Sequence, residues 1–270
     1  MADGTAAPTP GRLRGHLVAS GIAGQVATSR GDNLRNIGRL LDRHDSQHFG
    51  LELGRAWTSE QVLAVMAERV GIAADPSYTV GQDLIDPDLV VTALDRMRDR
   101  LALAARRRER VLLATGHPGG VLQLHLDVAA ALRAAGCEIL QPDVSAWSWP
   151  WEHDSDWARR RPRHVRCLGG VHVLAAGADL LHTHAPDPGR VLLAASAVPP
   201  DLVVADHGFA GVAAQAGIET LAYADSNDPA LFVAEAEGLP LLVVPLDDNV
   251  RPHLYAPLSA HLTTWPAGIA

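Results

Sequence analysis

The sequence predicts an α/β fold: a Rossmann-like, mostly parallel sheet preceded by an N-terminal helical subdomain. Three observations predict it. Beyond about residue 109, strand-like apolar segments alternate with helix-like segments, which is typical of a parallel sheet with helices on both faces. Residues 12–108 have helical apolar spacing without that alternation. Finally, 47% of the 270 residues are hydrophobic, which is enough for a large core.

The helical subdomain is expected over residues 12–108. Residues 59–70 have the apolar spacing of an amphipathic helix, and Thr58 is placed to cap it. A second long helix is predicted over residues 89–108, because Pro87 is well suited to a first helical turn.

The α/β domain is expected over residues 109–270. Strands are predicted at 111–115, 138–141, 202–205, 219–224 and 241–245, and helices at 118–135, 189–197, 210–216, 229–237 and 251–262. Two further segments, 171–174 and 179–182, are separated by a short Ala-Ala-Gly stretch. They fit either a hairpin or a strand that follows a short helix, and the pattern leaves both open.

Two segments fall outside this pattern. Residues 1–11 are small and rich in proline, and we expect a disordered tail. The segment 142–166 contains four of the six tryptophans and a run of arginines, and it is too polar for a core element. It fits either a lid or interface loop, or a loosely ordered insertion within the α/β domain.

The composition narrows the classes of partner. A net charge of −8 provides no overall basic surface for nucleic acid or an anionic membrane. No apolar run reaches the roughly 18–20 residues that span a bilayer, so we expect a cytoplasmic protein. The 23 Lys and Arg residues are all arginine, which excludes a Gly-Lys-Ser/Thr phosphate loop and a Schiff-base lysine. The oligomeric state is left open, a homo-oligomer included.

Four strand-like segments run directly into clusters of Asp, Asn and His. The clusters are Thr115-Gly116-His117, Asp206-His207-Gly208, Asp225-Ser226-Asn227-Asp228 and Asp247-Asp248-Asn249. Because the carboxyl ends of parallel strands meet at one edge of an open sheet, ligands bind in the crevice there. The sequence therefore predicts a metal-assisted active site at that edge.

Aspartate and asparagine side chains are the first candidate metal ligands. They are Asp206, Asp225, Asn227 and Asp228, whose hard oxygen atoms suit Mg²⁺ or Mn²⁺. Asp228 also precedes a proline, and capping the next helix is by itself enough to explain this residue. Asp247 and Asp248 fit either ligands or caps of the last helix.

Histidines supply further ligands and the candidate proton donors. His182-Thr183-His184 would place two imidazoles on the same side of an extended strand, a pairing that recurs in metal hydrolases. We therefore add His182 and His184 to the metal ligands. His117 and His207 are the candidate catalytic residues, because imidazole can transfer a proton near neutral pH.

A glycine turn and a polar cluster are the candidate substrate contacts. Gly116, Gly119 and Gly120 belong to a turn before a helix, where free backbone N–H groups attract anions such as phosphate. In the helical part, Arg30 and Asn33 could close over the site, although a plain loop would also explain them.

Taken together, these motifs resemble an actinobacterial family whose members are described as phosphatases. The resemblance rests on residues 114–120, 182–184, 204–208, 223–231 and 245–249, and it covers most of residues 15–262. The layout is also similar to that of the damage-control phosphatases, which bind a divalent metal at strand ends. Those proteins carry an Asp-Asn pair after the first strand, where this chain has Gly116-His117, so their ligand set does not transfer directly.

The leading hypothesis is a divalent-metal-dependent phosphatase that hydrolyses a small phosphomonoester, such as a sugar or nucleoside phosphate. Mg²⁺ or Mn²⁺ would activate a water molecule as the nucleophile. Two alternatives remain. One is a zinc-dependent amidohydrolase or deacetylase with His117, His182, His184 and His207 around the Zn²⁺ ion. The other is a non-catalytic protein that binds a small molecule in the same cleft.

Overall fold

The computed structural model describes residues 8–149 and 162–265. Most of the predicted tail and the centre of the tryptophan-rich segment lie outside the described residues. The elements are, in chain order, α1 (Pro10–Ser20), β1 (Gly24–Ser29), α2 (Arg30–Leu41), α3 (Asp45–His48), α4 (Ser59–Val70), β2 (Gln82–Ile85), α5 (Pro87–Arg107), β3 (Arg110–Thr115), α6 (Leu122–Ala134), β4 (Glu138–Ile139), β5 (Arg163–Leu168), β6 (Val171–Ala176), β7 (Asp179–Leu181), α7 (Asp187–Ala195), β8 (Leu202–Asp206), α8 (His207–Gln215), β9 (Thr220–Ala224), α9 (Pro229–Ala236), β10 (Leu241–Pro245), the 3₁₀ helix η2 (Pro252–Tyr255) and α10 (Ala256–Thr263).

The large sheet confirms the predicted mostly parallel α/β fold. Its order is β10-β9-β8-β3-β6-β5, with β4 beside β3 and β7 beside β6. The strands β10, β9, β8, β3 and β6 run parallel to one another, whereas β5 and β7 are antiparallel to β6. The open question at 171–182 is thereby resolved, because β6 and β7 form a hairpin. The four strands that end in the predicted clusters, β3, β8, β9 and β10, lie next to one another.

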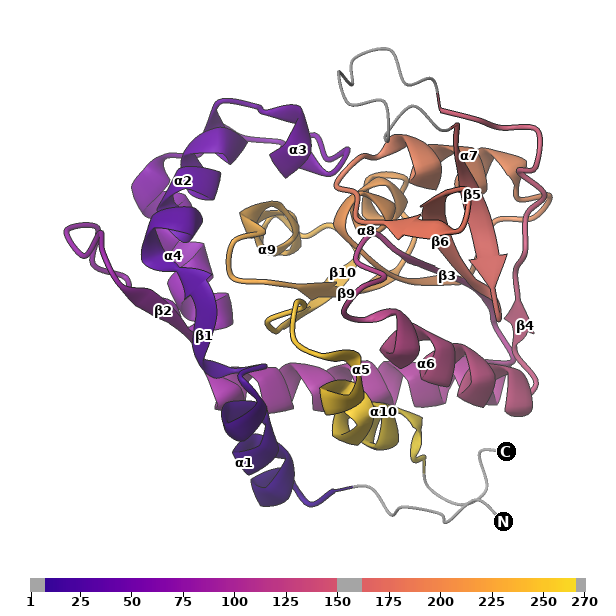
Figure 1. Ribbon diagram of the computed structural model, residues 1–270, viewed down its shortest axis with the longest axis horizontal. Helices are drawn as coiled ribbons and strands as arrows, with labels where there is room; N and C mark the ends of the chain where they lie inside the picture. Colours follow the sequence, from indigo (N-terminus) through magenta and orange to yellow (C-terminus); the bar gives the residue numbers. More distant parts are fainter. Residues whose placement is uncertain (1–7, 150–161, 266–270) are drawn as a thin grey trace.

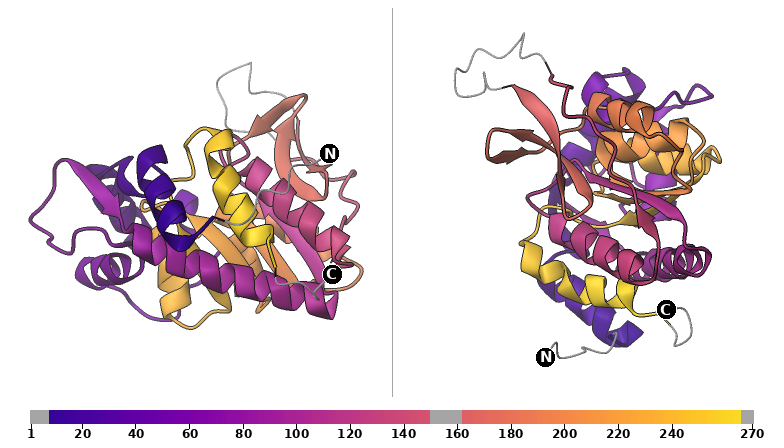
Figure 2. Two further views of the ribbon diagram at one scale, coloured as in Figure 1. Left: turned by 90° about the horizontal axis from the view of Figure 1, so that it is seen from below. Right: turned by 90° about the vertical axis from the view of Figure 1, so that its right-hand side faces the viewer.

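Helices cover both faces of this sheet. Figure 1 shows α1, α5, α6 and α10 on one side, and α7, α8 and α9 on the other. The view from below in Figure 2 shows α5, the longest helix, lying beside α10 and α6. Because both faces are covered, β8 and β9 are apolar and buried along their whole length up to Asp206 and Ala224. No helix of the described residues is long and apolar enough to cross a membrane.

The N-terminal part contains a two-stranded antiparallel sheet, β1–β2, which the helical prediction for residues 12–108 overlooked. Both strands are short, and β1 shows alternate burial only at its start, so neither gave a clear period-two signal in the sequence. The predicted helices are present as α4 and α5, and Thr58 and Gln61 form the cap of α4. Helices α2 and α4 pack against α9, which brings the end of β1 to the strand-end edge.

Four helix predictions in the α/β part differ from the structure, among them the helix predicted at 189–197, which is α7 at Asp187–Ala195. The helix expected from residue 118 begins at Leu122, because residues 118–121 form a turn after β3. The last predicted helix divides into η2 and α10. In contrast, α8 begins earlier than expected, directly at His207, whose φ of 47° lies in the left-handed region that non-glycine residues seldom adopt.

Candidate active site

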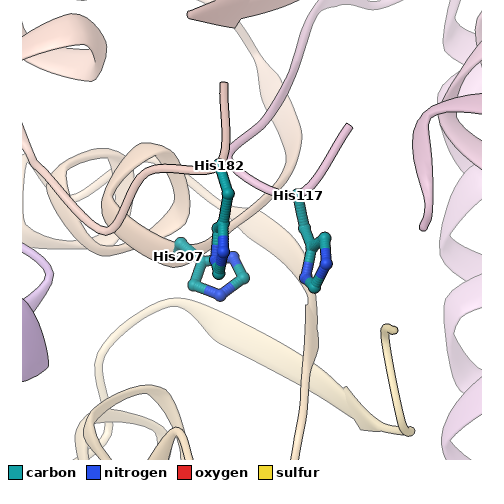
Figure 3. Close-up of side chains that lie close together, drawn as sticks. All are labelled: His117, His182 and His207. Atoms are coloured by element: carbon teal, nitrogen blue, oxygen red, sulfur yellow. The ribbon is translucent and has the colours of Figure 1, made fainter. Parts of the chain in front are cut away.

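The loops that follow β3, β8, β9 and β10 surround one cavity of about 420 Å³. Its lining is Ala27, Thr28, Asn36, His117, His182, His184, His207, Asp225, Asn227, Asp228, Asp247, Asp248, Asn249 and Val250. Figure 3 shows three of these imidazoles, His117, His182 and His207, gathered at the centre of the site. Segments separated by more than 100 residues in the chain therefore supply one constellation, as the strand-end argument predicted.

Asp206 and His207 form a buried pair at the back of the cavity. Asp206 Oδ1 lies 2.9 Å from His207 Nδ1 and accepts a second hydrogen bond, at 2.6 Å, from the backbone N–H of Gly116. Burial opposes ionisation of Asp206, but His207 outweighs it and lowers the pKa of Asp206 to about 2. Burial likewise opposes the charge on His207, yet Asp228, Asp206 and Asp248 together raise its pKa to about 10. Asp206 thus holds the ring so that Nε2 faces the cavity.

His184 and His182 lie beside His207, with ring centroids 4.5 Å and 5.2 Å from its own. His184 Nδ1 lies 2.7 Å from the carbonyl oxygen of Ser46. A carbonyl can only accept, so Nδ1 carries the hydrogen, and Nε2 of the neutral ring has a free lone pair. That Nε2 is 3.1 Å from Nε2 of His182. Burial and then the charge on His207 lower the pKa of His184 to about 3 and that of His182 to about 4. Both rings are therefore neutral near pH 7, the form that binds metals, whereas a cation that binds His207 would take the place of the proton on its Nε2.

Asp225, Asp247 and Asp248 form a carboxylate cluster on the other side of His207. One oxygen of each lies within 4.8 Å of the others, and all three side chains are buried. Thr28 Oγ1 donates to Asp225 at 2.6 Å, and the N–H of Asn249 donates to Asp247 at 2.9 Å. Burial first, and then the neighbouring carboxylates, raise the pKa of Asp225 and, with a smaller effect, that of Asp247.

Asp228 is at the N-cap of α9, but its side chain makes no capping hydrogen bond. The predicted helix start at Asp228 is confirmed, but the prediction that its side chain caps the helix is not. Its Oδ2 lies 3.5 Å from His207 Nε2, and its buried Oδ1 has no hydrogen-bond partner among the described residues. Burial raises the pKa of Asp228 to about 6. Asp247 and Asp248 do not cap the last helix either, because η2 begins at Pro252, after Arg251.

His117 joins the two groups. Its Nδ1 lies 3.0 Å from Asp248 Oδ2, and its ring stacks on that of His182 with centroids 4.4 Å apart. Burial lowers the pKa of His117, but the Asp248 carboxylate outweighs this and raises it. The remaining predicted ligand, Asn227, lines the cavity, and its backbone carbonyl accepts a hydrogen bond from Asn36 Nδ2 at 2.9 Å.

The glycine turn is closely packed against the site. The N–H groups of Gly116, His117 and Gly120 already donate to Asp206, Thr115 and the carbonyl of His117. A Cβ atom at Gly116 would collide with the carbonyl oxygen of Thr183, and one at Gly120 with that of Asp248, whereas Gly119 has open space. Close approach of the backbone therefore explains why glycine occupies positions 116 and 120. Because these N–H groups are already hydrogen-bonded, the turn has few of them left to bind an anion.

Arg30 and Asn33 are inside the N-terminal part, away from the cavity lining. The Arg30 guanidinium is fully buried and pairs with Asp83 at 2.9 Å, with further bonds to the carbonyls of Tyr78 and Asp75. Asn33 donates to Asp83 and accepts from Ser226 Oγ. The expectation that Arg30 closes over the site is not supported, because its donors are used within the fold.

Thr28, Asn36 and Ser46 are contacts of the site that the sequence did not reveal. All three come from the N-terminal part, at the end of β1, in α2 and in α3. Single polar residues in such positions carry no pattern of their own. Only the packing of α2 against α9 shows that they reach loops about 140 to 200 residues further along the chain.

A larger cavity of about 990 Å³ adjoins the first and shares Asn36, His182, His184 and Asn227 with it. Its lining includes Trp149, Arg35, Arg39 and Arg190. Trp149 belongs to the segment that was expected to form a lid or an interface loop; residues 150–161 lie outside the described part. The second cavity has space for the body of a small molecule whose reacting group lies among the histidines.

The fold and site define an α/β enzyme with clustered imidazoles and carboxylates at the strand ends. Residues 8–266 match the family model described as Phosphatase, and the chain belongs to this phosphatase family, a class of hydrolases. It is 47% identical over 263 residues to Phosphatase SCO2771 of Streptomyces coelicolor, which covers 95% of this chain and 96% of that relative. The resemblance to an actinobacterial phosphatase family is thereby confirmed.

Proposed function

We propose that this protein is a divalent-metal-dependent phosphomonoesterase that acts on a small phosphorylated metabolite, such as a sugar or nucleoside phosphate. The observation that supports it most is the gathering of four histidines and four aspartates in one small cavity of a phosphatase-family chain. No arginine is among the described residues that line this cavity, and the chain has no lysine. Without a cation, Asp225, Asp228, Asp247 and Asp248 would repel a phosphate group.

The donor set fits a divalent metal. Asp228 Oδ1 and Asp248 Oδ2 are buried and lack a hydrogen bond among the described residues, which is costly unless a cation is bound. Carboxylates suit Mg²⁺ and Mn²⁺, and imidazoles suit heavier ions such as Zn²⁺. The mixed set therefore favours Mn²⁺ over Mg²⁺ and keeps Zn²⁺ as the alternative.

The chain's own residues have distinct roles in this proposal. A bound divalent cation lowers the pKa of a coordinated water and neutralises phosphoryl charge. His117, whose pKa Asp248 raises, is placed to donate a proton to the leaving oxygen. His182 is exposed where the two cavities meet, so it can contact the phosphate as it enters. Asp206 holds His207 in position rather than binding the metal itself.

Hydrolysis assays with a metal-stripped protein test this proposal. The protein is freed of metal with a chelator, and p-nitrophenyl phosphate, sugar phosphates and nucleoside monophosphates are then offered with no metal, Mg²⁺, Mn²⁺ or Zn²⁺. We expect no turnover without metal and the highest turnover with Mn²⁺. Full phosphatase activity in protein that elemental analysis shows to be metal-free would overturn the metal dependence. Amide hydrolysis without phosphatase activity would favour the zinc amidohydrolase instead.

A further inference from the structure

Three groups of possible ligand atoms converge in the cavity: Asp225, Asp247 and Asp248; His184, His207 and Asp228; and His117, His182 and His207. The last two groups share His207, and Asp248 lies between the carboxylates and the imidazoles. On one side, Asp248 shares the carboxylate cluster with Asp225 and Asp247, within 4.8 Å. On the other, its Oδ2 lies 3.0 Å from His117 Nδ1 and 3.7 Å from His207 Nε2. This oxygen is buried, and no described group makes an aligned hydrogen bond to it. Asp248 is thus placed between two sets of ligands.

The second set consists of His184, His207 and Asp228, which also converge within 4.8 Å. Each imidazole has an outer hydrogen bond that fixes its ring: His184 Nδ1 contacts the Ser46 carbonyl, and His207 Nδ1 contacts Asp206. Such outer bonds are typical of metal-bound histidines, because they orient the other ring nitrogen toward the ion. Asp228 is buried, and within the described part of the chain its Oδ1 has no hydrogen-bond partner. The second set therefore has the properties of a prepared site, independently of the carboxylate cluster.

We propose that the cavity binds two divalent cations, an inference that rests on the metal dependence of the proposed function. One occupies the carboxylate position, formed by Asp225, Asp247 and Asp248. The other occupies the imidazole position, formed by His184, His207 and Asp228. Asp248 lies between them, where a carboxylate can bridge two ions.

His117 and His182 converge with His207 within 4.8 Å, but Nε2 of His207 can bind only one ion, so the proposal leaves these two histidines outside both positions. His117 faces Asp248. His182 is exposed at the junction with the larger cavity, and no carbonyl or carboxylate of the described residues makes an outer hydrogen bond to it. They remain free to contact the phosphate and the leaving oxygen. The charge balance agrees with this division, because two divalent cations neutralise the four carboxylates Asp225, Asp228, Asp247 and Asp248. A single ion would leave an excess of buried negative charge where a phosphate must bind.

Metal stoichiometry tests the inference without reference to activity. The protein, purified without a histidine tag and stripped with a chelator, is equilibrated with Mn²⁺ alone and freed of unbound ion, and the Mn²⁺ content per chain is measured. Electron paramagnetic resonance of the same sample reports whether the ions are close enough to couple. We expect two Mn²⁺ per chain and a coupled signal.

Variants assign the two positions. Asp247→Asn should remove the ion from the carboxylate position, leaving one Mn²⁺ per chain and no coupled signal. His184→Asn should give the same result by removing the ion from the imidazole position. Asp201→Asn, at the opposite end of β8, is the matched control and should keep both ions. Circular dichroism checks that each variant is folded. If one variant does not fold, the number of Mn²⁺ ions bound by the wild-type chain still tests the two-ion site.

The outcomes separate this inference from the proposed function. One Mn²⁺ per chain at saturation, together with metal-dependent phosphatase activity, would overturn the two-ion site and leave the proposed function standing. Two coupled ions in a protein that hydrolyses no phosphomonoester would support the two-ion site and overturn the function. Unchanged metal content in both Asp247→Asn and His184→Asn would contradict the ligand assignment.

Discussion

Asp206 and His207 are neighbours in the chain, and the carboxylate of the first lies 2.9 Å from Nδ1 of the second. The contact requires an abrupt change at the β8–α8 junction, where His207 adopts a φ of 47°. Strained backbone of this kind persists where the surrounding structure enforces it, and it is frequent at functional sites. At the end of β8, Asp206 thus orients the His207 imidazole so that it faces the cavity.

Replacing Asp206 with asparagine should reduce activity while leaving the fold intact. The amide keeps the size of the side chain but loses the charge that fixes the His207 tautomer, so we expect a loss of about 10–100-fold in kcat/KM or metal affinity. Steady-state kinetics and calorimetric Mn²⁺ titration measure both. Asp201→Asn, directly before the same strand, is the control and should change neither. A wild-type metal affinity and rate in Asp206→Asn would show that the contact has no orienting role.

The carboxylate cluster should make the metal-free protein less stable as the pH rises. The pKa of Asp225 is raised in the folded state, chiefly by burial and by Asp248, so the folded protein binds more protons than the unfolded chain above about pH 4. Its contribution to the free energy of unfolding therefore decreases with increasing pH. Asp225→Asn removes this dependence and should raise the melting temperature of metal-free protein at pH 8. With saturating Mn²⁺, the wild type should instead have the higher melting temperature of the two, because it binds the ion more tightly than Asp225→Asn does.

Thermal melts at pH 5 and pH 8, with chelator and with Mn²⁺, provide the comparison. Asp88→Asn is the control, since Asp88 is an exposed carboxylate outside the cluster. If Asp225→Asn melts below the wild type at pH 8 in chelator, the repulsion argument fails.

Gly120 and Gly119 form a matched pair for the glycine turn. A Cβ atom at Gly120 would collide with the carbonyl oxygen of Asp248, whereas Gly119 has open space. Gly120→Ala should displace the loop that carries Asp248, cost about 1–3 kcal/mol of unfolding free energy, and weaken metal binding. Gly119→Ala should be close to wild type in both measurements. Urea unfolding and Mn²⁺ titration of the two variants test this, and equal behaviour of the pair would contradict it.

The buried pair Arg30–Asp83 should be a determinant of stability. Asp83→Asn leaves the fully buried guanidinium of Arg30 without its counter-charge, so we expect a loss of about 3–5 kcal/mol in urea unfolding. Asp88→Asn removes an exposed ion pair with Arg14 and should have little effect. If Asp83→Asn proves as stable as Asp88→Asn, the pair does not hold the N-terminal part together.

Local sequence patterns were sufficient to predict the parallel sheet and the edge of it at which the candidate site lies. The apolar runs before Asp206, Asp225 and Asp247 are long enough to be strands buried on both faces, and parallel strands bring their carboxyl ends together. The sequence thus predicted that His117, Asp206, Asp225 and the 247–249 loop meet at one edge of the sheet. It could not distinguish a ligand from a cap at Asp228, because both roles occur at the same helix start.

The sequence by itself determined the α/β architecture, the strand-end edge and most of the residues that meet there, because these follow from the period of the apolar pattern along the chain. Only the tertiary structure decided that Asp206 supports His207, that Arg30 is buried against Asp83, and that Thr28 and Ser46 contact the site. The role of a polar side chain depends on which partner it meets in space. For Thr28 and Asp225, that partner lies 197 residues away, beyond the reach of any local pattern.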